Sequence, residues 1–358
     1  MVTILDRLIA RHVLYSMLLV LGVFLALTAF FVLVEGLSDY GKAGFGLFEL
    51  IKYVVLKQPR QIYELFPIVA LIGTIMGLST LALNSELIAM RAAGVSVARI
   101  VLATMKIGLV FTLVASLVGE YVVPTSENLA QLGRAKALAK GLQKKSSGIW
   151  LRSGTSFVSI GEVLPDLSLL RVNIYDFSGY SYLRTQTFAT RAFFSGDRWR
   201  LEDVQQSLII GQEAVQSRHV PTDDWQSQLT PDVVSVFAVQ PEGLSIQQLH
   251  YYIQHLQQNN QDTRNYRLVF WQKLLLPLAT LTMMLLATPF VFRPNRAGGV
   301  SQRVFTGVML GLAFVVANQG FGYLGLLYGV PPILGALIPT VFFFLIALYL
   351  LRRAARGL

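Results

Sequence analysis

Long apolar runs recur along the chain and are separated by short polar segments. Residues 13–34, 65–85 and 304–351 contain no Asp, Glu, Lys or Arg. A helix that crosses a bilayer needs about 20 predominantly apolar residues, and the turn at residues 329–332, Gly-Val-Pro-Pro, divides the last run. The pattern therefore predicts six spans, at residues 13–34, 62–83, 97–123, 268–292, 304–327 and 333–351.

Two shorter segments flank the first spans. Residues 4–10 are amphipathic and are expected to form a short lead on the membrane surface. Residues 47–60 have apolar positions at helical spacing, with Lys52, Lys57 and Arg60 on the other side. We expect this segment to be a separate helix that lies in the interface.

A charged segment, residues 84–96, joins spans two and three. Glu86 and Arg91 lie on a predicted short helix, and Gly94 is placed to end it, because glycine adopts left-handed backbone without steric cost. Two interpretations are open from the pattern alone. The charges either mark the membrane boundary, or they form a docking helix through which a soluble partner moves the two spans.

The sequence changes character at Pro124. Residues 124–266 are polar and contain no span, and residues 125–142 are expected to form a helix. Apolar and polar residues then alternate, as in residues 170–175, which is typical of strands. Strands are predicted at residues 157–160, 170–175, 182–194, 199–201, 207–211 and 233–239. Many short strands favour an all-β sandwich or roll of about 100 residues.

The chain is therefore expected to have three parts. Residues 1–123 form an N-terminal transmembrane half that includes the connecting helix at 84–95. Residues 124–265 form a β domain with flanking helices, and the capping box of Ser245 and Gln248 starts the helix that leads back to the membrane. Residues 266–358 form a C-terminal transmembrane half.

Composition supports an integral membrane protein. Of the 358 residues, 54% are hydrophobic and 14% are charged, which is too apolar for a water-soluble domain. The formal net charge is +10. Without an aromatic-interleaved basic repeat, this charge indicates orientation and anionic headgroups rather than nucleic acid. Cysteine is absent, which excludes disulfides, thiolate metal sites and cysteine nucleophiles.

Arginines gather on the side of the membrane that carries both termini. They lie in the N-terminal lead, the segment between spans two and three, the link at 293–303 and the C-terminal tail. The positive-inside rule makes that side cytoplasmic, so that the charged segment is cytoplasmic and the β domain lies outside.

Sequence motifs of catalysis or metal binding are missing. No G-x-x-x-x-G-K-[ST] loop is present, so the chain is not expected to bind ATP itself. His250 and His255 are five residues apart, which does not place two ligands on one helical face, and no carboxylate accompanies them. No Ser-His-Asp grouping or carboxylate pair lies inside the spans. We expect no enzyme activity, no catalytic residue, no metal and no other cofactor.

Span five carries two further features. Gly307-x-x-x-Gly311 is a spacing that lets another helix approach closely. Asn318 and Gln319 are a strongly polar pair in an apolar helix, and we expect them to hydrogen-bond across helices.

The chain closely resembles the LptF/LptG permeases of the lipopolysaccharide export ABC transporter. Five segments carry the resemblance, and their order and spacing are specific in combination. They are Leu5-Asp6-Arg7, Lys42-Ala43-Gly44, Ser85-Glu86-Leu87 with Ala93-Gly94, residues 245–250, and residues 328–339, YGVPPILGALIP. The last segment favours the LptG branch of the family.

The resemblance implies six transmembrane helices in a bacterial inner membrane and a periplasmic β-jellyroll between spans three and four. It implies pairing with an LptF-like permease, a cytoplasmic LptB-like ATPase dimer that binds the ATP, and an LptC-like periplasmic bridge. The segment between spans two and three is then the helix that couples to the ATPase, with Ser85, Glu86, Leu87, Met90, Arg91 and Gly94. Lipopolysaccharide would contact Lys42, Arg134, Phe314 and Phe321.

The resemblance thus implies a permease that extracts lipopolysaccharide from the outer leaflet of the inner membrane and passes it to the bridge. The sister permease LptF is an alternative within the family. An ATP-independent, ion-driven lipid flippase is an alternative from another class, and it predicts buried carboxylates in the spans. A scaffold that holds a periplasmic domain would need only one anchor.

Overall fold

The structure is a computed structural model in which most of the chain is described. The described residues are 4–41, 45–138, 143–145, 148–153, 156–163, 167–178, 182–196, 198–210, 214–227, 229, 231, 234, 240–258, 262–292 and 300–356.

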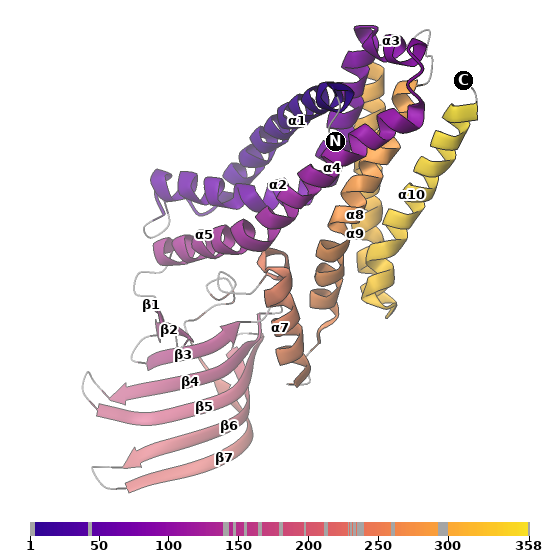
Figure 1. Ribbon diagram of the computed structural model, residues 1–358. Coiled ribbons are helices and arrows are strands. Elements are labelled where there is room, and N and C mark those ends of the chain that lie inside the picture. Colours follow the sequence, from indigo (N-terminus) through magenta and orange to yellow (C-terminus); the bar gives the residue numbers. More distant parts are fainter. Residues whose placement is uncertain are drawn as a thin grey trace. The chain divides into compact units, whose positions relative to one another are not determined.

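Six helices among these residues are long and apolar enough to cross a membrane (Figure 1). They belong to α1, α2, the continuous run from α4 to α5, α8, α9 and α10. The fold class, a helical membrane protein with an inserted β domain, is confirmed. The helical elements are α1 (Ile4–Leu37), α2 (Leu47–Leu83), α3 (Glu86–Ala92), α4 (Val97–Leu117), the π-helix η1 (Val118–Val122), α5 (Val123–Leu138), the 3-10 turn η2 (Pro241–Gly243), α7 (Ile246–Gln258), α8 (Arg264–Phe292), α9 (Val300–Leu327) and α10 (Pro332–Arg356).

Helices α1 and α2 approach each other backbone to backbone. A Cβ atom added at Gly73 would lie 2.7 Å from the Cα atom of Met17, and one added at Gly77 would lie 2.7 Å from the Cα atom of Val13. Real Cβ atoms essentially never come this close to backbone, so glycine is required at both positions. Small residues four apart permit this packing in membranes.

The Gly307-x-x-x-Gly311 spacing of α9 also faces α2. A Cβ atom at Gly307 would lie 2.7 Å from Cδ1 of Ile75, and one at Gly311 would lie 3.1 Å from Cγ2 of Ile68. The second span therefore packs against both the first and the fifth. The prediction that Asn318 and Gln319 hydrogen-bond across helices is wrong for the part of the chain that the structure describes, since neither amide makes such a bond there; both line a pocket instead.

Two segments predicted to lie on the membrane surface instead extend the spans. Helix α1 begins at Ile4, and Ile9 of the predicted lead is fully buried. Helix α2 runs unbroken through Pro59 and Pro67. Each proline removes one helical hydrogen bond, but the ion pair between Arg60 and Glu64, 2.7 Å long and one turn apart, holds the turns on both sides of the expected break together.

The inserted domain contains a seven-stranded antiparallel sheet in which each strand pairs with the next along the chain. Figure 1 shows its strands as long, curved arrows. The strands are β1 (Gln143–Lys145), β2 (Gly148–Ser153), β3 (Ser156–Val163), β4 (Leu169–Ser178), β5 (Tyr182–Ser195), β6 (Arg198–Ile210) and β7 (Ala214–Trp225).

The alternation in β4 is confirmed. Leu170, Val172 and Ile174 are buried, and Val172 pairs with Ile160 on one side and Ala189 on the other. Trp199 of β6 is fully buried, and its indole N–H donates to the carbonyl oxygen of Leu229 over 2.8 Å. The sheet therefore has one buried face, as its period of two requires.

Several strand boundaries differ from the prediction. The strands predicted at 199–201 and 207–211 are parts of one strand, β6, while β1, β2 and β7 were not predicted. Most of the strand predicted at 233–239 lies outside the described residues. A jellyroll contains Greek-key crossovers, whereas the described strands follow one another in chain order without a crossover.

The chain groups into two compact units. One comprises Met1–Phe31, Lys57–Ser126 and Pro241–Leu358; the other comprises Val32–Leu56 and Glu127–Gln240. The division at 123/124 and 265/266 stays a prediction.

Candidate functional site

The charged segment between spans two and three forms a short helix with defined ends. Helix α3 begins after Ser85, whose φ of 59° is left-handed, and it ends before Gly94, whose φ is 84°. The N–H of Gly94 donates to the carbonyl of Arg91, and the N–H of Val95 donates to the carbonyl of Met90. These two bonds form a Schellman motif, so Gly94 ends the helix as predicted.

Helix α3 has a buried side and an exposed side. Leu87 is 4% exposed and belongs to the same apolar cluster as Ile9 and Ile100, which fixes the helix on the ends of the spans. Ile88 of α3 and Leu83, the last residue of α2, are each 66% exposed. Exposed large apolar side chains on and beside a charged helix indicate a surface for another protein.

Glu86 supplies a second indication. It lies in the first turn of α3 and Arg91 in the last turn, which matches the helix dipole. The Oε2 atom of Glu86 is buried and has no hydrogen-bond partner among the residues that the structure describes. Because a buried acceptor without a donor costs free energy, this carboxylate is not satisfied by the described residues alone.

Two ion pairs hold the first and third spans together close to α3. Asp6 of α1 is largely buried; Lys106 Nζ lies 2.9 Å from its Oδ2 atom, and Arg99 Nη2 lies 3.5 Å from its Oδ1 atom. Both cations belong to α4, which follows α3 directly. The ion pairs therefore tie α1 to the helix that follows α3.

The predicted lipid contacts of span five differ in exposure. Phe314 is 4% exposed and meets Phe343 of α10 edge to face, with ring centroids 5.4 Å apart. Phe321 is 45% exposed, and it lies two helical turns from Phe314 on the same side of α9. Leu312 and Val316, one turn apart and 53% and 63% exposed, lie on the opposite side of the helix from Phe314. The structure therefore places Phe314 inside the bundle, where it lines a pocket, and leaves Phe321 partly exposed two turns further along the same side of α9.

Arg134 and Lys42 are the two residues predicted to contact lipid phosphates, and the structure describes Arg134 alone. Arg134 binds Asp39 through two hydrogen bonds, at 2.9 Å from Nε and 2.5 Å from Nη2, and its guanidinium lies 5.5 Å from the ring centroid of Tyr53. Its charge is thus already matched by a carboxylate. Lys42 lies outside the described residues.

A junction that the sequence reasoning missed joins the third span to α7. Glu120 lies in the π-helical turn η1, and its two carboxylate oxygens accept hydrogen bonds from the backbone N–H groups of Ile246 and Gln247 at 2.8 and 3.3 Å. A carboxylate at a helix N-terminus satisfies donors that the helix itself leaves open. Helix α7, which follows the inserted domain, is therefore started by a side chain of the third span.

The junction continues into α2 and α8. Gly119 packs so closely on Tyr63 that an added Cβ atom would clash with the ring. The Tyr63 hydroxyl donates to the carbonyl oxygen of Lys273 over 3.4 Å, and the Lys273 ammonium donates to the carbonyl oxygen of Leu244 over 2.5 Å. The sequence signal was that Glu120 and Lys273 are isolated charges in apolar runs.

Metal chemistry is not indicated by the described residues. No group of three His, Cys, Asp or Glu side chains among them is placed to hold a metal ion. The expectation of no cofactor stays a prediction.

Known proteins are similar to this chain over nearly its whole length. Residues 7–353 match the family model described as "Lipopolysaccharide export system permease LptF/LptG". The chain is 35% identical over 353 residues to the lipopolysaccharide export system permease protein LptG of Escherichia coli (strain K12), covering 98% of both chains. It is 33% identical over 356 residues to the protein of the same name in Haemophilus influenzae, covering 99% of both chains.

Proposed function

Because the chain belongs to the LptF/LptG family of lipopolysaccharide export permeases, we propose that it forms one half of a transporter together with an LptF-like permease. The chain is a permease subunit of lipopolysaccharide export and a multi-pass protein of the inner membrane. An LptB-like ATPase dimer binds and hydrolyses the ATP. The lipid is extracted from the outer leaflet and passed to an LptC-like bridge.

The observation that carries the proposed ATPase contact is the outer side of α3. Ile88 of α3 and Leu83 at the end of α2 supply exposed apolar area, and Glu86 supplies a carboxylate whose Oε2 atom has no donor among the described residues. A groove that covers this helix gains both the burial of apolar surface and a charge-assisted hydrogen bond. Leu87 and the Schellman motif at Gly94 hold the helix rigid, so that force passes into the spans.

The proposed orientation follows from the arginines. The N-terminal lead, the segment around α3, the 293–303 link and the C-terminal tail are the arginine-rich parts. With six spans these parts all lie on one side, which the positive-inside rule makes cytoplasmic. The β domain is then periplasmic, on the side of the bridge.

The proposed lipid surface is the outer face of α9 that carries Leu312 and Val316, together with α1. Both side chains are exposed there and suit acyl chains, and Phe321 is an exposed aromatic residue on the opposite side of α9. Phe314 lies behind this face, so that multi-acyl lipid on the outer face does not reach it.

The test of the proposed function reverses the charge of Glu86. Glu86→Lys removes a hydrogen-bond acceptor and adds a repulsive cation to the docking surface, a change of about 1–3 kcal/mol. We expect the ATPase to dissociate, or its hydrolysis to become uncoupled from lipopolysaccharide release, while the permease stays in the membrane. The measurements are co-purification of the ATPase subunit and lipid release from membranes.

Asp224→Lys on β7 is the matched control, because it makes the same change of charge on an exposed carboxylate of the inserted domain. The control should leave ATPase association unchanged. If Glu86→Lys retains both the ATPase and normal lipid release, α3 is not the docking helix.

A further inference from the structure

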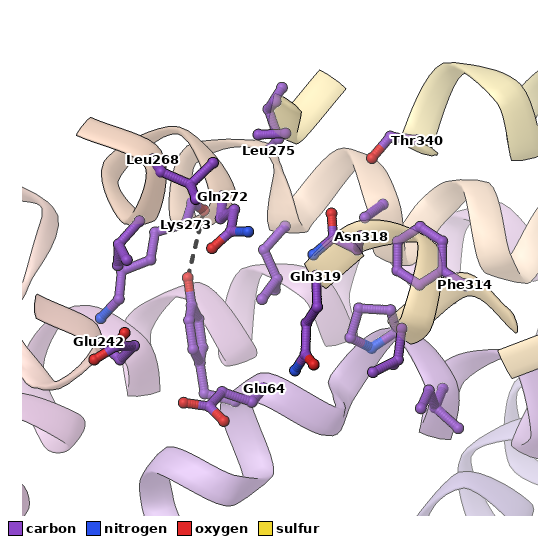
Figure 2. A pocket seen from close by; sticks show the side chains of 18 of the residues that line it. Glu64, Glu242, Leu268, Gln272, Lys273, Leu275, Phe314, Asn318, Gln319 and Thr340 are labelled. Atoms are coloured by element: carbon purple, nitrogen blue, oxygen red, sulfur yellow. Dashed lines mark hydrogen bonds between the residues drawn. The ribbon is translucent and has the colours of Figure 1, made fainter. Parts of the chain in front are cut away.

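A pocket of about 280 Å³ lies within the transmembrane unit, between α2, α8, α9 and α10, with η2 at one end. Its lining changes along its length, as Figure 2 shows. Glu242 and Lys273 lie at one end, the amides of Gln272 and Gln319 in the middle, and Phe314 at the far end.

The first end contains a cation buried within a transmembrane helix. Lys273 is 6% exposed, and its ammonium donates to the carbonyl oxygen of Leu244 and lies 5.4 Å from the ring centroid of Tyr63. No carboxylate among the described residues forms an ion pair with it. An ammonium has three N–H donors, and buried charges are normally paired. The remaining donors therefore suit an anionic group such as a phosphate.

Carboxylates lie at the same end. Arg60 is paired with Glu64 at 2.7 Å and approaches Glu242 at 3.7 Å, so that two carboxylates share one guanidinium. Both carboxylates are more exposed than Lys273, at 43% and 38% of their side chains. A headgroup that carries an ammonium beside its phosphate would gain a contact with these carboxylates that a purely anionic headgroup lacks.

The middle of the pocket contains amides without partners. Gln272, Asn318 and Gln319 line it, and none of their side chains makes a hydrogen bond to any described residue. An amide offers two donors and one acceptor. In a transmembrane bundle, three such groups around one cavity indicate a ligand with carbonyl or hydroxyl oxygens at this depth.

The far end is mainly apolar. Ile68, Ala279 and Phe314 are each almost fully buried and line it, and Thr340 is the polar residue on that side of the pocket. The pocket thus passes from charged to amide to hydrocarbon surface, in the order of the headgroup, ester linkage and acyl chain of a membrane lipid.

We propose that this pocket binds one glycerophospholipid with a zwitterionic, phosphoethanolamine-type headgroup. The phosphate contacts Lys273, the ammonium contacts Glu64 and Glu242, the ester oxygens contact the amides, and one acyl chain extends to Phe314. The lipid stays in place and fills the space between α2, α8 and α9. This site is distinct from the proposed lipopolysaccharide surface on the outer face of α9.

The size of the pocket selects the lipid. Small-molecule sites usually enclose about 300–1,000 Å³, so that 280 Å³ holds one chain with part of a headgroup. A lipid with many acyl chains does not fit. The balanced charges of the lining, two cations and two carboxylates, also favour a zwitterion over a lipid with several phosphates.

The experiment uses the full chain purified with its partner subunits and freed of lipid in detergent. It is titrated with phosphatidylethanolamine, phosphatidylglycerol or lipid A, and bound lipid is counted by native mass spectrometry. We expect one phosphatidylethanolamine per chain and weaker binding of the two anionic lipids. Lys273→Met should weaken phosphatidylethanolamine about tenfold, the effect of one lost charge-assisted hydrogen bond.

Ala279→Phe should block the acyl end of the pocket and abolish this binding. The matched controls are Lys52→Met, at an exposed lysine of α2, and Ala313→Phe, at an exposed alanine of α9; both should retain the lipid. Because a ligand stabilises only the state that binds it, phosphatidylethanolamine should raise the Tm of the wild type and of both controls, but not that of Ala279→Phe. This comparison is valid even if Ala279→Phe itself lowers the Tm.

Three outcomes overturn the proposal. The first is that both pocket variants bind phosphatidylethanolamine as the wild type does. The second is that the wild type binds phosphatidylglycerol more tightly than phosphatidylethanolamine. The third is that the pocket variants lose binding of lipid A instead of phosphatidylethanolamine. Because ATPase association is not read in this experiment, its failure leaves the role of α3 untouched.

Discussion

At the scale of single residues, charge pairing decides which cations are available to a lipid phosphate. Arg134 is held by Asp39 and lies over Tyr53, and its side chain is only 24% exposed. To bind a phosphate, its guanidinium must either release Asp39 or contact Asp39 and the phosphate at the same time. A guanidinium has five donors, and the two described bonds to Asp39 leave donors for sharing.

Substitutions of Arg134 and Asp39 should change the amount of bound lipopolysaccharide in opposite directions. Arg134→Ala removes the cation and should lower lipopolysaccharide co-purification with the assembled transporter about tenfold, the worth of one charge-assisted contact. Asp39→Asn removes the competing carboxylate and should increase the amount of bound lipopolysaccharide. Lys42→Ala should have a smaller effect than Arg134→Ala.

The alternative is that the Arg134–Asp39 pair only anchors its helices. Both substitutions would then lower assembly and leave the lipid bound per assembled complex unchanged. A measurement of lipid per complex, with assembly scored separately, distinguishes the two roles.

At the scale of elements, glycine spacing decides which helices touch. Gly73 and Gly77 lie one turn apart on α2 and face the backbone of α1, while Gly22 of α1 has no atom within 4 Å of an added Cβ. The first pair permits contact and the other glycine faces open space. The contact between α1 and α2 thus requires glycine at positions 73 and 77, whereas position 22 has room for a side chain.

Gly77→Ala should separate α1 from α2. The added Cβ atom meets backbone at Val13 and His12, which cannot rotate away, so we expect a loss of about 1–3 kcal/mol, typical of overpacking. Thermal unfolding in detergent measures it, and Gly22→Ala is the control. Equal Tm values for the two variants would show that the α1–α2 contact is looser than described.

At the scale of the whole molecule, the junction at Glu120 connects the third span to the helix that follows the inserted domain. Glu120 accepts from the first N–H groups of α7, and Lys273 of α8 holds the carbonyl of Leu244 just before it. A movement of the third span therefore acts directly on the start of α7. The π-helical turn that carries Glu120 is a feature often found at functional positions.

Glu120→Ala should loosen the start of α7 by about 0.5–2 kcal/mol, as expected for a lost N-terminal cap. Faster amide hydrogen exchange at residues 246–249 measures this directly. We expect lipopolysaccharide release to fall while ATPase association stays normal, in contrast to Glu86→Lys. Glu120→Gln keeps one acceptor and should be intermediate.

An unchanged exchange rate at residues 246–249 in Glu120→Ala would mean that α7 is started by its capping box alone. The described capping box is complete, since Gln248 N–H donates to Ser245 Oγ and Ser245 N–H donates to the Gln248 side chain. Ser245→Ala is the variant that removes it.

The sequence alone determined the class of fold, six spans, a short helix within residues 84–95 and its end at Gly94. Each of these depends on a local property: the length of an apolar run, the period of apolar positions, or the freedom of one glycine. The family resemblance added the function, because residues in a fixed order over nearly the whole chain are specific in combination.

The tertiary structure decided what joins these elements. The ion pairs of Asp6 with Lys106 and of Asp39 with Arg134, and the hydrogen bond from Tyr63 to Lys273, join residues separated by 100, 95 and 210 positions. The continuity of α1 and α2 beyond the predicted surface segments depends on such contacts as well. No local pattern encodes them, because which side chains meet depends on how the helices pack, and that in turn depends on the glycine faces of α2 and α9.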